Sequence, residues 1–391
     1  PWIVPAEVAD LYTRRTQELR AIVAERHAKE QEWAKANPDL AAELQNFIDG
    51  KLPEIDWADI KHKPDVATRN ASSDCLTVLS HKVKNMIVSS ADLCNSDKTD
   101  GFLKGTHAMT RGDLSGGFLH AGVAELTMAS IMNGIALHGG LYAACGTFFV
   151  FSDYMKPAIR MAALMELPVK YVWSHDAFRV GEDGPTHEPI EQEAQIRLLE
   201  QMNNLSGKPS ILVLRPADAM ETNVCWKMAM ENKDTPTALI LSRQNVPDIP
   251  AVSGERYTQA LGAEKGAYII YGTTANPDIT LVANGSEVSL LIEVAKRLEA
   301  EGISPRVVSA PSIGLFEHQD TEYRASVIPT DGKIFGLTAG LPVTLRPLVG
   351  AKGEIYGLER FGASAPYKVL DEKFGYTADN IFNRVKSYMA K

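Results

Sequence analysis

The chain has 391 residues, 45% of them hydrophobic and 23% charged, which is ordinary for a globular protein of two or three domains. It carries 40 Lys and Arg residues against 49 Asp and Glu residues, and the net charge of −9 argues against nucleic acid as a main partner. No apolar run reaches the roughly 18 residues that a membrane span needs, so we expect no membrane partner. The four cysteines lack C-x-x-C spacing and predict free or buried thiols in a reducing compartment: Cys75, Cys94, Cys145 and Cys225.

The first segment of the chain predicts helices. Apolar residues recur at three- and four-residue spacing over residues 6–36, which indicates an amphipathic helix that ends at Asn37-Pro38. A second, shorter helix is expected over residues 39–49, before Gly50. We interpret residues 1–64 as a helical linker, and an arm that only packs against its neighbours is the favoured interpretation.

From residue 65 onward, helices alternate with short apolar strands. Strands are expected at residues 86–89, 168–173, 211–214 and 237–242. The helix expected over residues 122–138 has mostly small and apolar side chains, so we expect it to be buried. Unbroken apolar strands joined by crossover helices predict a parallel sheet that is covered on both faces.

A second unit of the same kind begins near residue 253. Its expected strands cover residues 279–283, 306–310, 333–337 and 354–358. Ser286 is expected to cap a helix over residues 287–301, and Thr377 is expected to cap the last helix. The fold class is therefore α/β, with two doubly wound, mostly parallel-sheet domains, at residues 65–252 and 253–391, after the linker.

The stretch GEDGPTHEP at residues 181–189 follows a predicted strand, at the end of the sheet where α/β proteins bind ligands. A phosphate-binding loop would need the GxxxxGK[ST] pattern, and a metal site would need ligands at fixed spacing; neither pattern is present. Two interpretations stay open. The stretch is a solvated turn, or Asp183 accepts hydroxyl groups of a polyol while His187 exchanges protons near a carbonyl.

Two further features point to a binding site. Glu125 lies in an otherwise apolar helix, where a carboxylate needs a hydrogen-bonding partner, either as a structural cap or as a ligand contact. Phe148, Phe151 and Tyr154 recur at three-residue spacing, which could place them on one helical face. Such a row is usually core packing. Beside a carboxylate, it can also stack on a flat heterocycle while the carboxylate bonds to a ring nitrogen.

Together these segments resemble a known family. GEDGPTHEPIEQEAQIR (181–197) resembles the transketolase signature along its whole length. AGVAELTM, GIALHGG, TFFVFSDY, RMAALM, SHD, RPAD and TALILSRQN follow in family order with near-family spacing, and GSEV and FGASAP match the family's C-terminal domain. The similarity covers nearly the whole chain, which therefore resembles the pyrimidine-binding and C-terminal domains of a transketolase.

The resemblance implies a reaction and a set of residues. Transketolases (EC 2.2.1.1) use thiamine diphosphate and Mg²⁺ or Ca²⁺. In the pentose phosphate pathway they move a two-carbon ketol unit from xylulose 5-phosphate to an aldose phosphate, such as ribose 5-phosphate or erythrose 4-phosphate. By resemblance, Glu125 bonds N1′ of the aminopyrimidine, which favours the imino tautomer that takes the proton from thiazolium C2. The matched pocket of the aminopyrimidine is Phe148, Phe151 and Tyr154, and Asp92 matches an aspartate near the cofactor.

The substrate-binding residues are also carried by the resemblance. Asp183 matches the aspartate near the donor's C2 hydroxyl, and His187 matches a histidine that contacts the ketol unit and acts in catalysis. The matched phosphate binders are Arg69, Ser96, His175 and Arg243. Arginine grips phosphate through two parallel hydrogen bonds, so an acidic chain can still bind sugar phosphates in a small positive pocket.

Three departures from the family are visible: an insertion at residues 200–210, Ala124 in place of an arginine, and a loosely similar loop at residues 98–117. They bear on acceptor preference and loop geometry. The family's GDG motif with its following Asn is missing, and the chain begins at Pro1 without a Met, where the family's linker begins. We expect the diphosphate and metal ligands to lie outside this sequence, with no metal site within it, and this chain alone to be inactive.

The resemblance leaves alternatives and implies a partner. The chain could be the C-terminal subunit of a naturally split transketolase. It could be a sister thiamine enzyme, such as deoxyxylulose-phosphate synthase or a dehydrogenase E1 component, or a non-catalytic assembly module. The family works as a homodimer with each active site between two subunits, so we expect a second copy as partner and a cytoplasmic location.

Overall fold

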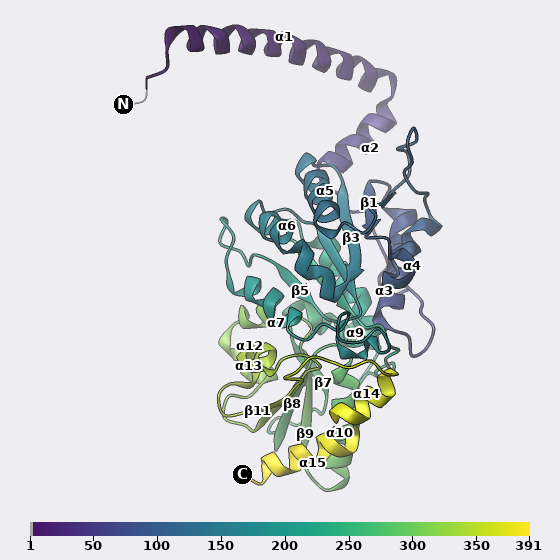
Figure 1. The fold of residues 1–391 in the computed structure, drawn as a ribbon, viewed down its shortest axis with the longest axis vertical. Coiled ribbons are helices and arrows are strands. Elements are labelled where there is room, and N and C mark those ends of the chain that lie inside the picture. The colour runs from purple at the N-terminus through teal and green to yellow at the C-terminus, as the bar shows by residue number, and fades with distance from the viewer. Residues whose placement is uncertain (1–2) are drawn as a thin grey trace. The chain divides into compact units, whose positions relative to one another are not determined.

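The computed structural model describes residues 3–391; residues 1 and 2 of the expected linker lie outside the described residues. The chain divides into two compact units, and the division falls between Lys51 and Leu52. The first unit holds α1 (Ala6–Ala36) and α2 (Pro38–Ile48), which confirms both predicted helices (Figure 1). Pro38 disfavours helical backbone at the preceding residue, so α1 ends there and α2 starts with the proline at its first position.

The second unit begins with a six-stranded sheet in which all neighbouring strands are parallel. In spatial order the strands are β2 (Phe118–His120), β1 (Met86–Ser90), β3 (Tyr142–Phe148), β4 (Lys170–Ser174), β6 (Thr237–Leu241) and β5 (Leu212–Leu214). All four strands predicted for this part of the chain are present. The short strand β2 and the strand β3 were not predicted.

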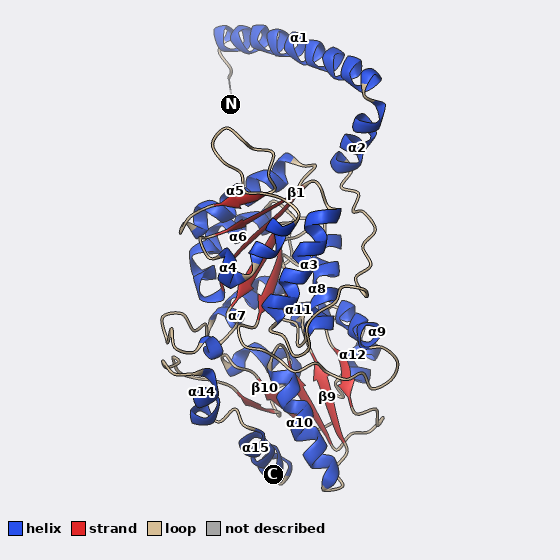
Figure 2. Cartoon of the chain, turned by 90° about the vertical axis from the view of Figure 1, so that its right-hand side faces the viewer, coloured by secondary structure: helices blue, strands red, loops and turns tan. Residues whose placement is uncertain are grey.

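Helices cover both faces of this sheet, as predicted (Figure 2). On one face, α3 (Thr68–Lys82) and α8 (Ala219–Glu231) pack over residues such as Val172; on the other, α5 (Glu125–His138) and α6 (Ser152–Leu164) pack over Tyr171 and Trp173. Successive side chains of a strand point to opposite faces, so one apolar strand supplies both cores. Shorter helices are α4 (Cys94–Asp97) and α7 (Gln192–Arg197), with 3₁₀ segments at Thr99–Lys104, Phe149–Phe151, Phe178–Val180 and Leu198–Gln201.

The second sheet has five strands, and only β7 runs antiparallel to its neighbour. In spatial order they are β11 (Glu354–Tyr356), β10 (Ile334–Leu337), β8 (Ile279–Ala283), β9 (Pro305–Ser309) and β7 (Tyr268–Tyr271). The helices are α9 (Arg256–Ala260), α10 (Glu287–Ala300), α11 (Ile313–Glu317), α12 (Thr321–Val327), α13 (Arg346–Val349), α14 (Tyr367–Phe374) and α15 (Ala378–Met389), with 3₁₀ segments at Leu261–Lys265 and Pro342–Leu345. This confirms the α/β class with mostly parallel sheets. The domain boundaries at residues 64 and 252 stay predictions.

Two local predictions were wrong and one was confirmed. Thr377 caps α15 by accepting a hydrogen bond from the Asn380 backbone N–H at 3.3 Å. Ser286 does not cap α10, because its own backbone is already helical and its hydroxyl donates to Glu287 instead. The burial expected for α5 is also wrong on one side: Leu126 and Leu137 are 47% and 62% exposed. Only one face of α5 has the sheet and α6 to pack against.

Two further findings concern the chain between residues 3 and 391. None of its helices is both long enough and apolar enough to cross a membrane. All four cysteines are free thiols, as predicted.

Candidate active site

The predicted site residues collect at one edge of the six-stranded sheet. Strands β3, β4 and β6 end side by side, because Phe148 is paired with Ser174 and Ser174 with Leu241. His175 directly follows β4, and Arg243 lies two residues after β6. Asp92 lies two residues after β1, and Glu125 begins the helix that follows β2. The carboxyl ends of parallel strands share one edge, so these residues are brought together from distant parts of the sequence.

Glu125 is buried and has no partner for its side chain. It is 8% exposed, and its side chain makes no hydrogen bond or ion pair with any other residue in the range 3–391. The structural interpretation weighed from the sequence, a cap within the fold, therefore has no contact to support it. Because no side chain or backbone group of the described chain uses this carboxylate, it is available to form a hydrogen bond with a ligand.

The three aromatic residues form a row, although not on one helix. Phe148 ends β3, Phe151 lies in the 3₁₀ segment that follows, and Tyr154 lies in α6. The rings of Phe148 and Phe151 are stacked with centroids 6.1 Å apart and an interplanar angle of 9°, and those of Phe151 and Tyr154 are also 6.1 Å apart. The helical face expected from the spacing is wrong, but the aromatic row exists. Because α5 packs against β3 and α6, Glu125 begins a helix beside this row.

Two histidines meet the aromatic row. The His175 ring stacks on Phe148 with centroids 3.6 Å apart. His187 meets Phe148 and Phe151 edge-on, at 6.4 Å and 5.4 Å. His175 is 3% exposed, whereas His187 is only partly buried. His175 is therefore packed inside the fold, whereas His187 keeps part of its surface exposed.

Positive charge surrounds His175. Burial, together with the charges of Arg69, Arg243 and His187, lowers its pKa to about 2. Arg69 donates from Nη1 to the backbone oxygen of Ser96 at 2.7 Å, while its Nε is buried without a partner among the described residues. Clustered cations with an unused donor fit an anion such as a phosphate ester.

Asp97, which the sequence analysis missed, fixes the turn that holds Ser96. Its carboxylate accepts hydrogen bonds from the hydroxyls of Ser90 at 2.6 Å and Thr99 at 2.7 Å. Burial raises the pKa of Asp97 to about 6, against the lowering by these hydrogen bonds. The sequence did offer a signal for Asp97: it is an acidic residue directly after Ser96, which is predicted to bind phosphate.

The stretch 181–189 forms a turn that rests on the second sheet domain. Gly181 and Gly184 have φ of 92° and 75°, which other residues rarely adopt, so no helix can form here. The Ser364 hydroxyl donates to the backbone oxygen of Glu182 at 2.6 Å. Asp183 is exposed, and its side chain contacts no partner among the described residues. The motifs GEDGPTHEP and FGASAP are therefore neighbours in space.

Glu188 of this stretch was also missed by the sequence analysis. It is 2% exposed, and a Cβ added to Gly362 would lie 1.4 Å from its Oε2, so only glycine leaves room for it. Burial raises the pKa of Glu188 to about 7, although the backbone N–H groups of Ala363 and Gly181 favour its charged form. Its position directly before Pro189, in a stretch that also holds Gly181 and Gly184, was the signal in the sequence.

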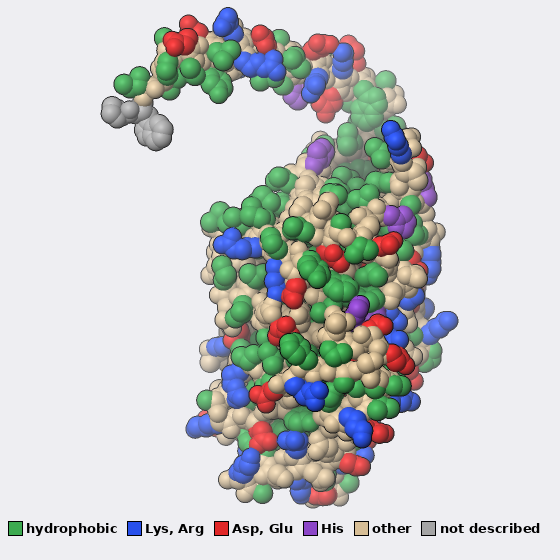
Figure 3. Space-filling view, in the orientation of Figure 1, with side chains coloured by type: hydrophobic (Ala, Val, Ile, Leu, Met, Phe, Trp, Pro, Cys, Tyr) green, Lys and Arg blue, Asp and Glu red, His purple; other side chains and the backbone are tan. Residues whose placement is uncertain are grey.

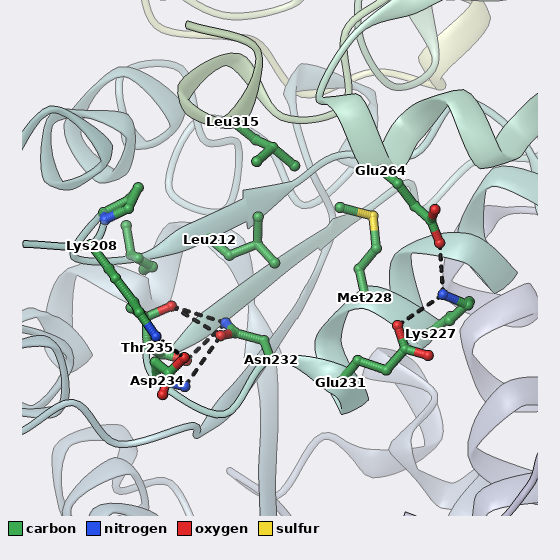
Figure 4. Close-up of a pocket in the computed structure, with 12 residues that line it drawn as sticks. Lys208, Leu212, Lys227, Met228, Glu231, Asn232, Asp234, Thr235, Glu264 and Leu315 are labelled. Atoms are coloured by element: carbon green, nitrogen blue, oxygen red, sulfur yellow. Dashed lines mark hydrogen bonds and ion pairs between the residues drawn. The ribbon is translucent and has the colours of Figure 1, made fainter. Parts of the chain in front are cut away.

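A separate pocket of about 430 Å³ lies at the other edge of the same sheet (Figure 4). It opens at the amino ends of β5 and β6, and its floor includes Leu212 and Met228. Its two lysines already have carboxylate partners: Lys208 pairs with Asp234, and Lys227 bonds to Glu231 and Glu264. None of the predicted site residues lines it.

Within residues 3–391, no group of three or more His, Cys, Asp or Glu side chains is placed to hold a metal ion.

Two family profiles match the chain. The profile described as transketolase, pyrimidine binding domain, matches residues 64–248, and that described as transketolase-like TK C-terminal domain matches residues 266–377. The transketolase of Halalkalibacterium halodurans is 41% identical over 398 residues, which covers 99% of this chain and 56% of that protein. The chain thus spans little more than half the length of this relative.

Solved structures agree. The transketolase from Leishmania mexicana has a TM-score of 0.89 and 31% identity over 99% of this chain and 55% of its own. A Pichia stipitis transketolase in complex with xylulose 5-phosphate has a TM-score of 0.86 and 35% identity over 99% of this chain and 56% of its own. A chain described as a split-gene transketolase, an inactive beta4 tetramer, matches with a TM-score of 0.63 and 24% identity over 83% of this chain and 99% of its own, which shows the fold alone.

Proposed function

Because the chain belongs to the transketolase family, we propose that it carries the pyrimidine-facing and substrate-facing half of a ketol-transfer site. The donor would be xylulose 5-phosphate, and the acceptors would be ribose 5-phosphate and erythrose 4-phosphate. The observation that carries this proposal is Glu125, which is only 8% exposed, has no partner for its side chain among the described residues, and begins the helix beside the stacked row of Phe148 and Phe151. That pairing fits an aminopyrimidine ring, which needs both a stacking surface and a carboxyl group for a ring nitrogen.

Each side chain then has a defined task. Thiamine diphosphate, when bound, supplies the nucleophilic carbon that ketol transfer needs. Glu125 would hold N1′ through its carboxyl group, and the row of Phe148, Phe151 and Tyr154 would pack against the ring. Asp92, at φ 66° after β1, lies at the same edge and would line the cofactor pocket. The diphosphate and its Mg²⁺ or Ca²⁺ would be held by residues outside this sequence.

The substrate would bind across the neighbouring strand ends. Arg69, Ser96, His175 and Arg243 would bind its phosphate, with His175 as a neutral hydrogen-bonding group because its pKa is low. His187, partly exposed beside the aromatic row, would bind the ketol oxygen and exchange a proton with it. Asp183, exposed and unpartnered, would accept the donor's C2-side hydroxyl.

The proposed assembly is a homodimer in the cytoplasm. Large apolar side chains are exposed on α5 and α6, and Figure 3 shows hydrophobic side chains gathered over these two helices. They include Leu126, Ile131, Leu137, Tyr154, Met161 and Leu164. Such a contiguous patch next to a predicted site indicates a protein interface, and we propose a second copy of this chain as its partner.

A split enzyme is the second candidate. A chain described as a split-gene transketolase is covered over 99% of its own length by this fold. In that arrangement the diphosphate-binding domain would come from a separate polypeptide, and the tasks of the residues above would not change.

The test is ketol transfer from xylulose 5-phosphate to ribose 5-phosphate, with thiamine diphosphate and Mg²⁺. The chain is assayed alone and with the separately expressed N-terminal part of the Halalkalibacterium halodurans relative. Activity is expected only in the mixture. Glu125→Gln is expected to lower kcat by at least about 100-fold, as is usual for loss of a proton-transferring group. The control is Glu182→Gln, because Glu182 is exposed on the neighbouring loop. Full activity of the Glu125→Gln mixture, or transfer from pyruvate in place of the ketose, would contradict the proposal.

A further inference from the structure

A buried network of charged side chains joins the two sheet domains beside the candidate site. All of its members except Asp371 are buried. The first sheet domain supplies Asp176, Arg179, Glu193, Arg197, Glu200 and Arg215, and the second supplies Glu287 and Asp371.

Glu287 stands at the centre of this network. It is the first residue of α10 and is 0% exposed. Its Oε2 accepts a hydrogen bond from Arg215 Nη1 at 2.6 Å, and its Oε1 accepts from Arg179 Nη1 at 2.5 Å. Burial alone would raise the pKa of Glu287, but the two guanidinium groups outweigh it and hold the pKa below its ordinary value. One carboxylate of the second domain therefore binds two arginines of the first.

Arg215 links Glu287 to the backbone next to His175. Its Nη2 and Nε donate to Oδ2 of Asp176 at 2.6 Å and 3.1 Å, and Asp176 directly follows His175. His175 has φ of 63°, a left-handed backbone that residues with a side chain rarely adopt. Such a conformation persists only where its surroundings hold it in place. Here the strand fixes the residue before His175, and Arg215 fixes the residue after it.

Arg179 links Glu287 to the loop at residues 181–189. Besides Glu287, it binds Oδ1 of Asp371 through Nε at 2.7 Å, and it lies two residues before Gly181. The loop that begins there holds Asp183 and His187. Segment 175–181 is therefore held at its two ends by Arg215 and Arg179, and both arginines bind the carboxylate of Glu287.

We propose that Glu287 is a positioning residue of the active site: through Arg215 and Arg179, it fixes the backbone that presents His175 and the loop with His187. Stability alone does not explain the network. A buried ion pair contributes little more than apolar side chains of the same volume would, whereas its hydrogen bonds impose one geometry. The inference rests on the proposed function for the roles of the two histidines, but the backbone geometry can be measured without turnover.

The test is hydrogen–deuterium exchange on the whole chain, followed in peptides that cover residues 170–190. Glu287→Gln keeps the size of the side chain and removes its charge. Exchange over residues 175–188 is expected to become about tenfold faster, while β8 and β9 keep their rates. The matched control is Glu293→Gln on the same helix, which breaks only an exposed pair with Arg297, and it should leave these peptides unchanged.

Asp371→Asn provides an independent arm, because Asp371 binds Arg179 and not Arg215. It is expected to loosen residues 178–188 while residues 172–176 exchange at the wild-type rate, and this arm stands even if Glu287→Gln does not fold. The inference is overturned if a folded Glu287→Gln chain exchanges like the wild type over residues 175–188. It is also overturned if the increase spreads equally over β8, β9 and α10, or if Asp371→Asn loosens both segments alike.

A kinetic arm separates this inference from the proposed function. In the reconstituted mixture, Glu287→Gln should raise KM for the ketose phosphate several-fold more than it lowers kcat, because the groups that contact substrate remain but are misplaced. A fall in kcat alone would overturn the positioning role. If the wild-type mixture is inactive, the proposed function is contradicted. The hydrogen–deuterium exchange result then decides alone whether Glu287 is a positioning residue.

Discussion

His175 offers a prediction that depends only on the fold. Its ring is 3% exposed and stacks on Phe148, and burial together with the charges of Arg69 and Arg243 lowers its pKa to about 2. We predict that this ring stays neutral from pH 8 down to pH 5. The perturbations are the pH itself and the variant His175→Gln, which keeps a polar side chain but cannot take up a proton.

The magnitude follows from proton linkage. In the unfolded chain the His175 ring binds a proton with a pKa of about 6.5, whereas in the folded chain it does so only near pH 2. Below about pH 6.5 the unfolded state therefore holds one more proton, and the free energy of unfolding falls as the pH falls. The slope approaches about 1.4 kcal/mol per pH unit, and the loss between pH 7.5 and 5.5 is about 1.4 kcal/mol in total, since titration of the unfolded ring is only complete well below pH 6.5.

Two measurements check this value. Urea unfolding at pH 7.5 and 5.5 should show that His175→Gln loses about 1.4 kcal/mol less stability than the wild type over this range. In NMR spectra of the chain with ¹³C-labelled histidine rings, the signal that disappears in His175→Gln should not move between pH 8 and 5.5. A wild-type signal that titrates with a midpoint near 6.5 would refute the reasoning.

Two other substitutions test packing in other parts of the two sheet domains. Lys170 is buried with its amine bonded to the Pro168 backbone oxygen, and burial lowers its pKa to about 7, so its contribution makes the wild type more stable as the pH rises from 7 toward 10. Lys170→Met should therefore raise the melting temperature at pH 7.5 and flatten its rise toward pH 9.5; a lower melting temperature at both values would contradict this. Gly285 has φ of 57°, and a Cβ there would lie 2.6 Å from Cζ of Arg215. Gly285→Ala should destabilise the chain by about 3 kcal/mol in urea unfolding, against about 1–2 for Gly302→Ala, whose Cβ would meet nothing within 4 Å; equal losses would show that the buried arginine moves freely.

The regular elements could be predicted because their signals are local. Apolar spacing, Asn37-Pro38 and Thr377 each act within a few residues, and each predicted element was found. The errors came where a distant neighbour decides. Ser286 has the chemistry of a cap, but the carboxylate of Glu287 accepts its hydroxyl in a network with distant arginines. The apolar composition of α5 could not tell which of its faces would lack a neighbour within this chain.

For the candidate site, too, local signals could be predicted and distant neighbours could not. Three-residue spacing brought the aromatic residues to attention, but it predicted one helix where a strand end, a 3₁₀ turn and a helix follow one another. The rings still stack, with centroids 6.1 Å apart in each neighbouring pair. The partners of Arg215 could not be predicted from local patterns, since Glu287 lies 72 residues away in the sequence.

Three short motifs that resemble the family form one unit in space. SHD supplies Asp176, RPAD supplies Arg215, and GSEV supplies Glu287. Arg215 donates hydrogen bonds to both carboxylates at the domain interface. None of them lies in the aromatic row where a cofactor would bind. Under the proposed positioning role, a sequence that kept Glu125 but lost Arg215 or its two carboxylate partners would lose the geometry of His175. Matches to these three motifs therefore report on the contact between the two sheet domains.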